Sequence, residues 1–187
     1  LEPGYVTNSK VLKLAKELAD NKQTPLEKAS AAYTYVARTV RYGRPPTESL
    51  TRNSRSATRM LEDLRGDCKD KSALLVQLLR AMKLQANVAA VMTSDEGRAP
   101  FLPSARFNHA LVRLTVNGQT YWLDAANGPF GFADLPAGDQ GIHALVLDRD
   151  SFHFDQIASP NEDFRGESRE SVGVIAIDGS YAFDATF

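Results

Sequence analysis

The chain has 187 residues, of which 43% are hydrophobic and 24% are charged, and its formal net charge is -1. These proportions are typical of one ordinary globular domain, and the near-neutral charge gives no general attraction to nucleic acid or to a membrane surface. No run reaches the roughly 18 apolar residues that a membrane span needs, and a single cysteine excludes an internal disulfide.

The first third of the chain predicts helices. A polar residue at position 8 or 9 can cap a helix in which apolar residues recur at helical spacing. The run TPLE at residues 24–27 is a capping box with proline at the first helical position, which is a specific signal for a second helix. Residues 43–54 contain two adjacent prolines and predict a loop, after which Ser56 caps a short helix. The predicted helices cover residues 9–19, 25–41 and 57–64.

The only cysteine lies where a loop becomes a strongly amphipathic helix, which extends to about Lys83. Gly66 can adopt a positive φ and so end the preceding segment, and Asp67 is a good N-cap. Cys68 then falls in the first helical turn, where free amide groups and the helix dipole favour a thiolate. Most free cysteines are nevertheless buried and inert, so a reactive Cys68 requires a base nearby.

The second half of the chain predicts strands, at residues 86–92, 107–116, 119–125, 142–147, 172–177 and 181–187. Asn117-Gly118, between two alternating apolar runs, is the strongest short-range signal for a hairpin with a type I′ turn. Residues 93–106 predict a long loop of the kind that is often functional, and residues 155–171 look irregular and polar.

The hairpin register ranks the three histidines as candidate bases. With Val116 opposite Gln119, His109 and Asp124 lie on one face of the hairpin as diagonal neighbours. A carboxylate that binds one imidazole nitrogen leaves the other as a base for a cysteine nucleophile. Taken alone, the pair could be an ordinary cross-strand contact; its combination with a cysteine at a helix start favours a catalytic interpretation. His143 and His153 have no such partner and are expected to be structural.

Three motifs together carry a resemblance to a known family: GDCKDK at residues 66–71, FNHALV at 107–112 and YWLD at 121–124. They resemble the transglutaminase-like superfamily, which has a papain-like catalytic core. The first motif, with DLP at residues 134–136, resembles a bacterial subgroup that carries an N-terminal β domain, and often another after the core. That N-terminal domain is absent from this sequence. The similarity extends from about Leu12 to Leu147.

The resemblance implies Cys68 as nucleophile, His109 as general base and then acid, and Asp124 as the carboxylate that orients it. It implies an α+β fold, in which N-terminal helices and a central nucleophile helix pack on an antiparallel sheet. The reaction implied is acyl transfer through a thioester, with water or an amine as acceptor, on a peptide or a glutamine amide of a protein or peptide substrate. No cofactor and no metal are implied. The subgroup usually has Asp-Pro-Thr where this chain has Asp124 followed by Ala-Ala-Asn, so the turn after the carboxylate is expected to differ.

We expect residues 1–150 to form the catalytic core and residues 151–187 to form a C-terminal extension with a β-hairpin, possibly the edge of a following β domain. The chain begins with Leu1 rather than Met and carries no signal-peptide pattern, so we expect it to be a piece of a longer chain. Flanking β domains of that longer chain are possible partners. The subgroup implies a location in the periplasm or the cell envelope.

Several interpretations stay open at this level. A non-catalytic interaction module could retain the same fold, although all three triad residues are present here. A zinc site is poorly supported, because one cysteine and three scattered histidines lack paired ligand spacing. Tyr42 and Asn53 are candidates for a second oxyanion donor. Lys69 and Lys71 could lower the pKa of Cys68, or could simply belong to a solvated helix face with Asp67 and Asp70.

Overall fold

The computed structural model describes residues 8–43, 55–93, 107–128, 130–148, 151–159, 170–175 and 181–186. Four helices come before the main sheet in the chain: α1 (Ser9–Ala19), α2 (Pro25–Thr39), α3 (Ala57–Asp63) and α4 (Cys68–Ala81). The sheet strands are β3 (Gln85–Val91), β4 (His109–Val116), β5 (Gln119–Leu123), β6 (His143–Leu147) and β7 (Phe152–Gln156). The α+β fold with a transglutaminase-like core is therefore confirmed.

The helices begin where the sequence predicts, because each has a side-chain cap. Asn8 accepts hydrogen bonds from the first-turn amides of α1, and Ser56 does so for α3. The capping box of α2 is present with Pro25 at its first position. α2 ends two residues earlier than predicted, because Val40 is extended and leads into a short strand.

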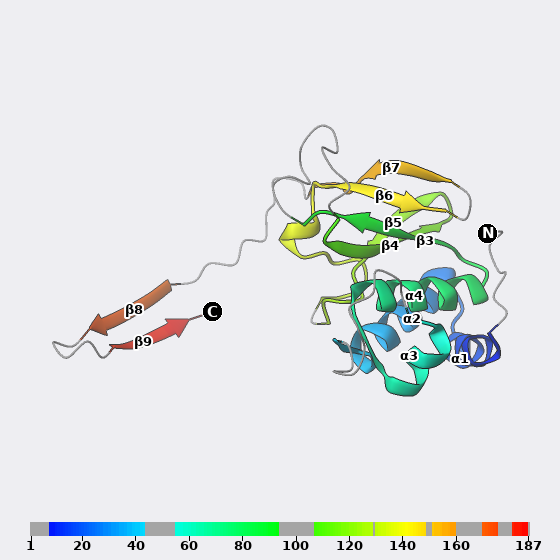
Figure 1. The fold of residues 1–187 in the computed structure, drawn as a ribbon, viewed down its shortest axis with the longest axis horizontal. Helices are drawn as coiled ribbons and strands as arrows, with labels where there is room; N and C mark the ends of the chain where they lie inside the picture. The colour runs from blue at the N-terminus through cyan, green and yellow to red at the C-terminus, as the bar shows by residue number, and fades with distance from the viewer. Residues whose placement is uncertain are drawn as a thin grey trace.

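Helix α4 is the centre of the molecule. It packs against the other three helices on one side and against β3 and β4 on the other, and Figure 1 shows it between the helical layer and the sheet. The leucine pairs that recur at helical spacing are all buried, since both sides of the helix meet other elements: Leu74, Leu75, Leu78 and Leu79. A central helix that carries the cysteine is thus a property of the structure.

The five-stranded sheet is antiparallel throughout, in the order β5-β4-β3-β6-β7. One face contributes Val112 and Leu114 to the core around α4. The opposite face contributes Leu111 to a second, smaller core with Ile142 and Ile157. Because side chains alternate along β4, this strand joins the two cores and holds its first residue, His109, at its end.

Two strand assignments go beyond the sequence prediction. β1 (Arg41–Tyr42) and β2 (Arg65–Gly66) form a short parallel pair, too short to show any periodicity. β7 occupies residues 152–156, partly within a segment that was expected to be irregular, and that part of the expectation is wrong. The division of the chain at residue 150 stays a prediction, and the pairing of β6 with β7 places the fifth strand just beyond it.

The last predicted hairpin is present as β8 (Glu170–Ile175) and β9 (Tyr181–Thr186), a separate two-stranded antiparallel sheet. Of the predicted loop at 93–106, all but Thr93 lies outside the described residues, as does Asn53. None of the helices that the structure describes is both long enough and apolar enough to cross a membrane.

Candidate active site

The start of α4 is held by a capping box that is buried. The Asp67 carboxylate accepts hydrogen bonds from the Lys69 N–H at 3.0 Å and the Asp70 N–H at 3.1 Å. Asp70, which is 0% exposed, accepts in return from the Asp67 N–H at 3.1 Å and from the Arg55 N–H at 2.7 Å. The first turn, with Cys68 in it, is therefore fixed from both sides.

Gly66 serves this turn by its small size. Its φ is not positive; the left-handed residue that ends α3 is Leu64, at φ 46°. A Cβ on Gly66 would lie 2.6 Å from Met60 Sδ and 2.7 Å from Asp70 Cβ. The expectation that Gly66 ends the preceding segment through a positive φ is therefore wrong, and the glycine is needed because α3 and α4 approach each other closely here.

Cys68 is buried, and its backbone amide remains available. Among the described residues, no oxygen accepts a hydrogen bond from the Cys68 N–H, because the Asp67 side chain takes the next two amides. Burial by itself raises the pKa of the Cys68 thiol, but a hydrogen bond to His109 and the His109 charge outweigh burial and lower this pKa. Asp67 opposes this effect and Lys69 adds to it. The environment of Cys68 is thus one that favours a thiolate.

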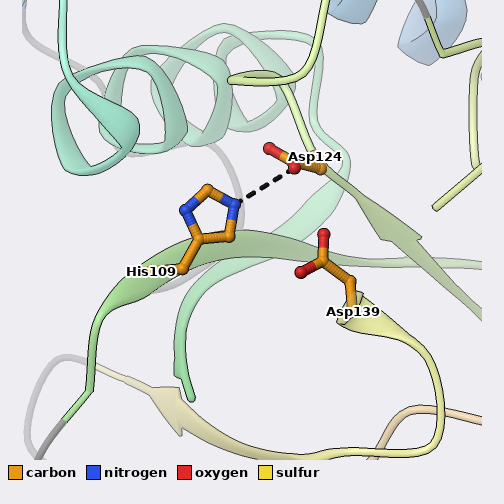
Figure 2. Close-up of side chains that lie close together, drawn as sticks. All are labelled: His109, Asp124 and Asp139. Atoms are coloured by element: carbon orange, nitrogen blue, oxygen red, sulfur yellow. Dashed lines mark hydrogen bonds and ion pairs between the residues drawn. The ribbon is translucent and has the colours of Figure 1, made fainter. Parts of the chain in front are cut away.

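His109 and Asp124 are in contact, as the hairpin register predicts. Val116 pairs with Gln119 around Asn117-Gly118, and the His109 Nε2 lies 3.1 Å from the Asp124 Oδ2. Figure 2 shows Nε2 facing Asp124 and the other ring nitrogen pointing away from it. That other nitrogen, Nδ1, is therefore the one left for Cys68.

The charges around His109 explain its protonation. Burial lowers the pKa of His109, but hydrogen bonds to Asp124 and Cys68 and the Asp124 charge outweigh burial and raise this pKa to about 10. Burial raises the pKa of Asp124, and its bond to His109 together with donors from Ala126 and Asn127 lowers it overall. At neutral pH the arrangement is a carboxylate, an imidazolium and a thiolate in sequence.

The turn after Asp124 supplies further donors to that carboxylate. The Ala126 N–H donates to Oδ1 at 2.8 Å and the Asn127 side-chain amide donates to Oδ2 at 2.8 Å. The departure from the subgroup pattern at these positions therefore leaves Asp124 well satisfied.

Two polar residues of α4 dock the helix on its neighbours. The Ser72 Oγ donates to the Ala110 carbonyl at 2.9 Å, which ties the first turns of α4 to the strand residue next to His109. Lys71 is 1% exposed and donates to the carbonyls of Val40 at 2.8 Å and Ala37 at 3.3 Å, at the C-terminal end of α2. The solvated-face interpretation is therefore wrong for Lys71, whereas Lys69 pairs with Asp67 near the surface.

The remaining sequence candidates differ in position. The Tyr42 hydroxyl hydrogen-bonds with Cys68, and burial followed by the Cys68 charge raises its pKa. The Tyr42 residue as a whole is nevertheless 62% exposed, so it forms an accessible wall of the site. His143 lies at the start of β6, and His153 is exposed on β7. Neither is among the groups that the structure places at Cys68.

Sequence reasoning missed one residue of the site, Asp139. It ends a 3-10 turn, η2 (Ala137–Asp139), is 2% exposed, and approaches His109 from the same side as Asp124 (Figure 2). One oxygen of its carboxyl, Oδ2, has no hydrogen-bond partner among the described residues. The turn has no periodic pattern, and no sequence signal links it to the hairpin.

The same three residues offer the best metal ligands in the described part of the chain. One ligand atom each from His109, Asp124 and Asp139 lie within 4.8 Å of one another. The contact between His109 Nε2 and Asp124 Oδ2 already uses two of these atoms. A metal ion bound there would therefore displace the proton that joins the pair.

Comparison with protein-family models gives a match to the transglutaminase-like superfamily over residues 12–126, which is more than half of the chain and includes Cys68, His109 and Asp124. The chain belongs to the transglutaminase-like superfamily. A comparison with curated protein sequences finds no match.

Two solved structures share the fold. One is a "putative protease" from Parabacteroides distasonis, with a TM-score of 0.64 and 17% identity over 85% of this chain and 29% of that one. The other is a "putative cysteine protease" from Cytophaga hutchinsonii, with a TM-score of 0.50 and 21% identity over 88% of this chain and 55% of that one. This transglutaminase-like chain thus spans under a third of the first and about half of the second.

Proposed function

We propose that this chain catalyses cysteine-dependent acyl transfer on peptide or glutamine amide carbonyls through a thioester. The observation that carries the proposal is the connected arrangement of Cys68, His109 and Asp124, in which the pKa of the thiol is lowered and the pKa of the imidazole is raised. Membership of a superfamily that includes cysteine enzymes supports the same chemistry.

In the first half-reaction, the Cys68 thiolate attacks the amide carbonyl carbon and an oxyanion forms. The Cys68 N–H, at the positive end of α4, donates a hydrogen bond to that oxyanion, and the Tyr42 hydroxyl is placed to be a second donor. His109 then gives its proton to the leaving nitrogen, the C–N bond breaks, and a thioester on Cys68 remains.

In the second half-reaction, neutral His109 takes a proton from the acceptor, which attacks the thioester and releases the Cys68 thiolate. Water as acceptor gives hydrolysis, and a primary amine gives transamidation. Asp124 stays ionised and holds the imidazolium through Nε2 in both halves.

Both outcomes can be measured in one experiment. The wild-type chain is incubated with a glutamine-containing protein and a fluorescent primary amine, and separately with peptides that carry a fluorogenic leaving amine. Amine incorporation identifies transfer and release of the fluorophore identifies hydrolysis. We expect Cys68→Ala to lose activity completely and His109→Ala to lose it by about a thousandfold or more, because it removes both the base and the acid.

The matched control is His153→Ala, since His153 is the exposed histidine on β7. It should retain wild-type rates. Activity that survives in Cys68→Ala would refute the proposal. Complete inactivity of the wild-type chain on both substrates, together with a Cys68 that alkylates as slowly as a simple thiol, would favour the non-catalytic interaction module.

A further inference from the structure

Asp139 places a second carboxyl beside the ion pair that the proposed mechanism uses. Its carboxyl hydrogen-bonds with Asp124 and lies within 4.8 Å of a ring nitrogen of His109. Asp139 is 2% exposed, and its Oδ2 has no partner among the described residues. Figure 2 shows both carboxyls on the Nε2 side of the ring.

Two buried carboxyls this close share a proton, because like charges disfavour each other's ionisation. Among the described residues, the titratable groups that act on Asp139 are Asp124, at the end of β5, and His109, at the start of β4. Cys68, at the start of α4, contacts the other ring nitrogen of His109. Burial and the Asp124 charge raise the pKa of Asp139 to about 7, against the opposing effect of His109.

We propose that Asp139 is a positioning residue of the catalytic triad, which holds a proton against Asp124 and thereby sets how strongly Asp124 stabilises the His109 imidazolium. This inference rests on the proposed function, and it assigns the triad a second carboxyl that does not touch the substrate.

The two states of Asp139 have opposite consequences for His109. When Asp139 is protonated, its O–H donates to Asp124, and one negative charge faces the imidazolium. When Asp139 is ionised, a second negative charge faces the imidazolium and stabilises it further. A more stable imidazolium is a weaker acid toward the leaving nitrogen. The proton on Asp139 therefore keeps His109 acidic enough to complete the first half-reaction.

The test is a titration of the His109 ring by NMR, in which the His109→Ala spectrum assigns its signals. In the wild type, we expect the His109 shifts to change with a midpoint near pH 7, the pKa of Asp139, well below the titration of His109 itself near pH 10. The same step should persist in Cys68→Ala, which separates Asp139 from the thiol.

The decisive variant is Asp139→Asn, which keeps the shape and a donor but cannot ionise. We expect the step near neutrality to disappear, and the His109 titration to stay about tenfold in proton affinity below its wild-type value because the second charge is never formed. Asp134→Asn is the matched control, since this exposed carboxyl lies in the same segment; it should leave both features unchanged. His143 and His153 are internal controls.

A step that persists in Asp139→Asn would overturn the proposal. If that variant does not fold, infrared spectroscopy of the wild type decides: the carbonyl stretch of a protonated carboxyl should be present at pH 6 and lost above pH 8. A wild type with no such band would also overturn it. These measurements need no turnover, so they can fail while His109→Ala still inactivates the enzyme, and they can succeed if the proposed reaction is wrong.

Discussion

Helices α2 and α4 begin with the same local motif in opposite environments. In α2, the Thr24 hydroxyl accepts from the Glu27 N–H at 3.2 Å, and the Glu27 carboxylate accepts from the Thr24 N–H at 2.8 Å, both at the surface. In α4, Asp67 and Asp70 make the same two reciprocal bonds at 3.1 Å, but Asp70 is completely buried.

The comparison teaches what burial adds to a helix-start signal. Water can replace the caps of α2, so its capping box contributes only to the stability of the helix end. No water is available to Asp70, and its second oxygen also holds the backbone of Arg55. The capping box of α4 therefore fixes the direction of the turn that carries Cys68, and its loss should affect both stability and the site.

The largest effect is expected at the buried end of this comparison. Asp70→Ala leaves the N–H groups of Asp67 and Arg55 without their acceptor, and we expect a loss of about 3 kcal/mol in the free energy of unfolding. Urea denaturation gives this value, and iodoacetamide labelling of Cys68 should slow in the same variant. Glu27→Ala, at the equivalent position of α2, should leave the labelling rate unchanged. Equal losses of stability in the two variants would contradict the account.

A smaller loss is expected from Gly66→Ala, which tests the close packing behind the buried box. The added methyl meets Met60 and Asp70 at distances that no Cβ adopts, so α3 must shift. We expect about 2 kcal/mol of destabilisation in thermal or urea unfolding. The control is Gly138→Ala, where the nearest atom lies 3.7 Å from the new Cβ. Comparable losses in the two variants would show that the packing at Gly66 is not special.

The smallest effect is expected at the exposed box. Thr24→Ala removes one surface cap from α2 and should cost about 1 kcal/mol in unfolding free energy, while Thr24→Ser should restore most of it. Neither variant should change Cys68 labelling, because α2 starts far along the chain from the site. A slower labelling rate in Thr24→Ala would mean that the two boxes are coupled.

The sequence was sufficient for the parts of the site that local rules control. Asn117 and Gly118 both have positive φ, as a type I′ turn requires, and that turn alone sets the register that brings His109 to Asp124. Asp67 and Thr24 mark helix starts by their position before an amphipathic run. These features depend on residues close in sequence, so a pattern can reveal them.

Other parts of the site depend on contacts between distant segments. Lys71 looks like a surface residue in a charged run, and only the carbonyls at the end of α2 explain its burial. Asp139 reaches His109 from a non-periodic turn, so its role follows from the tertiary structure alone. Phe152 and Phe154 alternate with polar residues, a period-two signal for β7, yet both are exposed and so lack the usual burial pattern of a strand.

The central claim is that Cys68 is a thiolate at neutral pH because His109 holds the opposite charge. Ultraviolet difference absorbance of the thiolate, against Cys68→Ala as the blank, tests it directly across a pH titration. We predict a full thiolate signal at pH 7 in the wild type and in His153→Ala, and its loss in His109→Ala until the pH approaches about 8.5, the value of an unperturbed thiol. A wild-type signal that appears only near that pH, at the same midpoint as in His109→Ala, would contradict the claim.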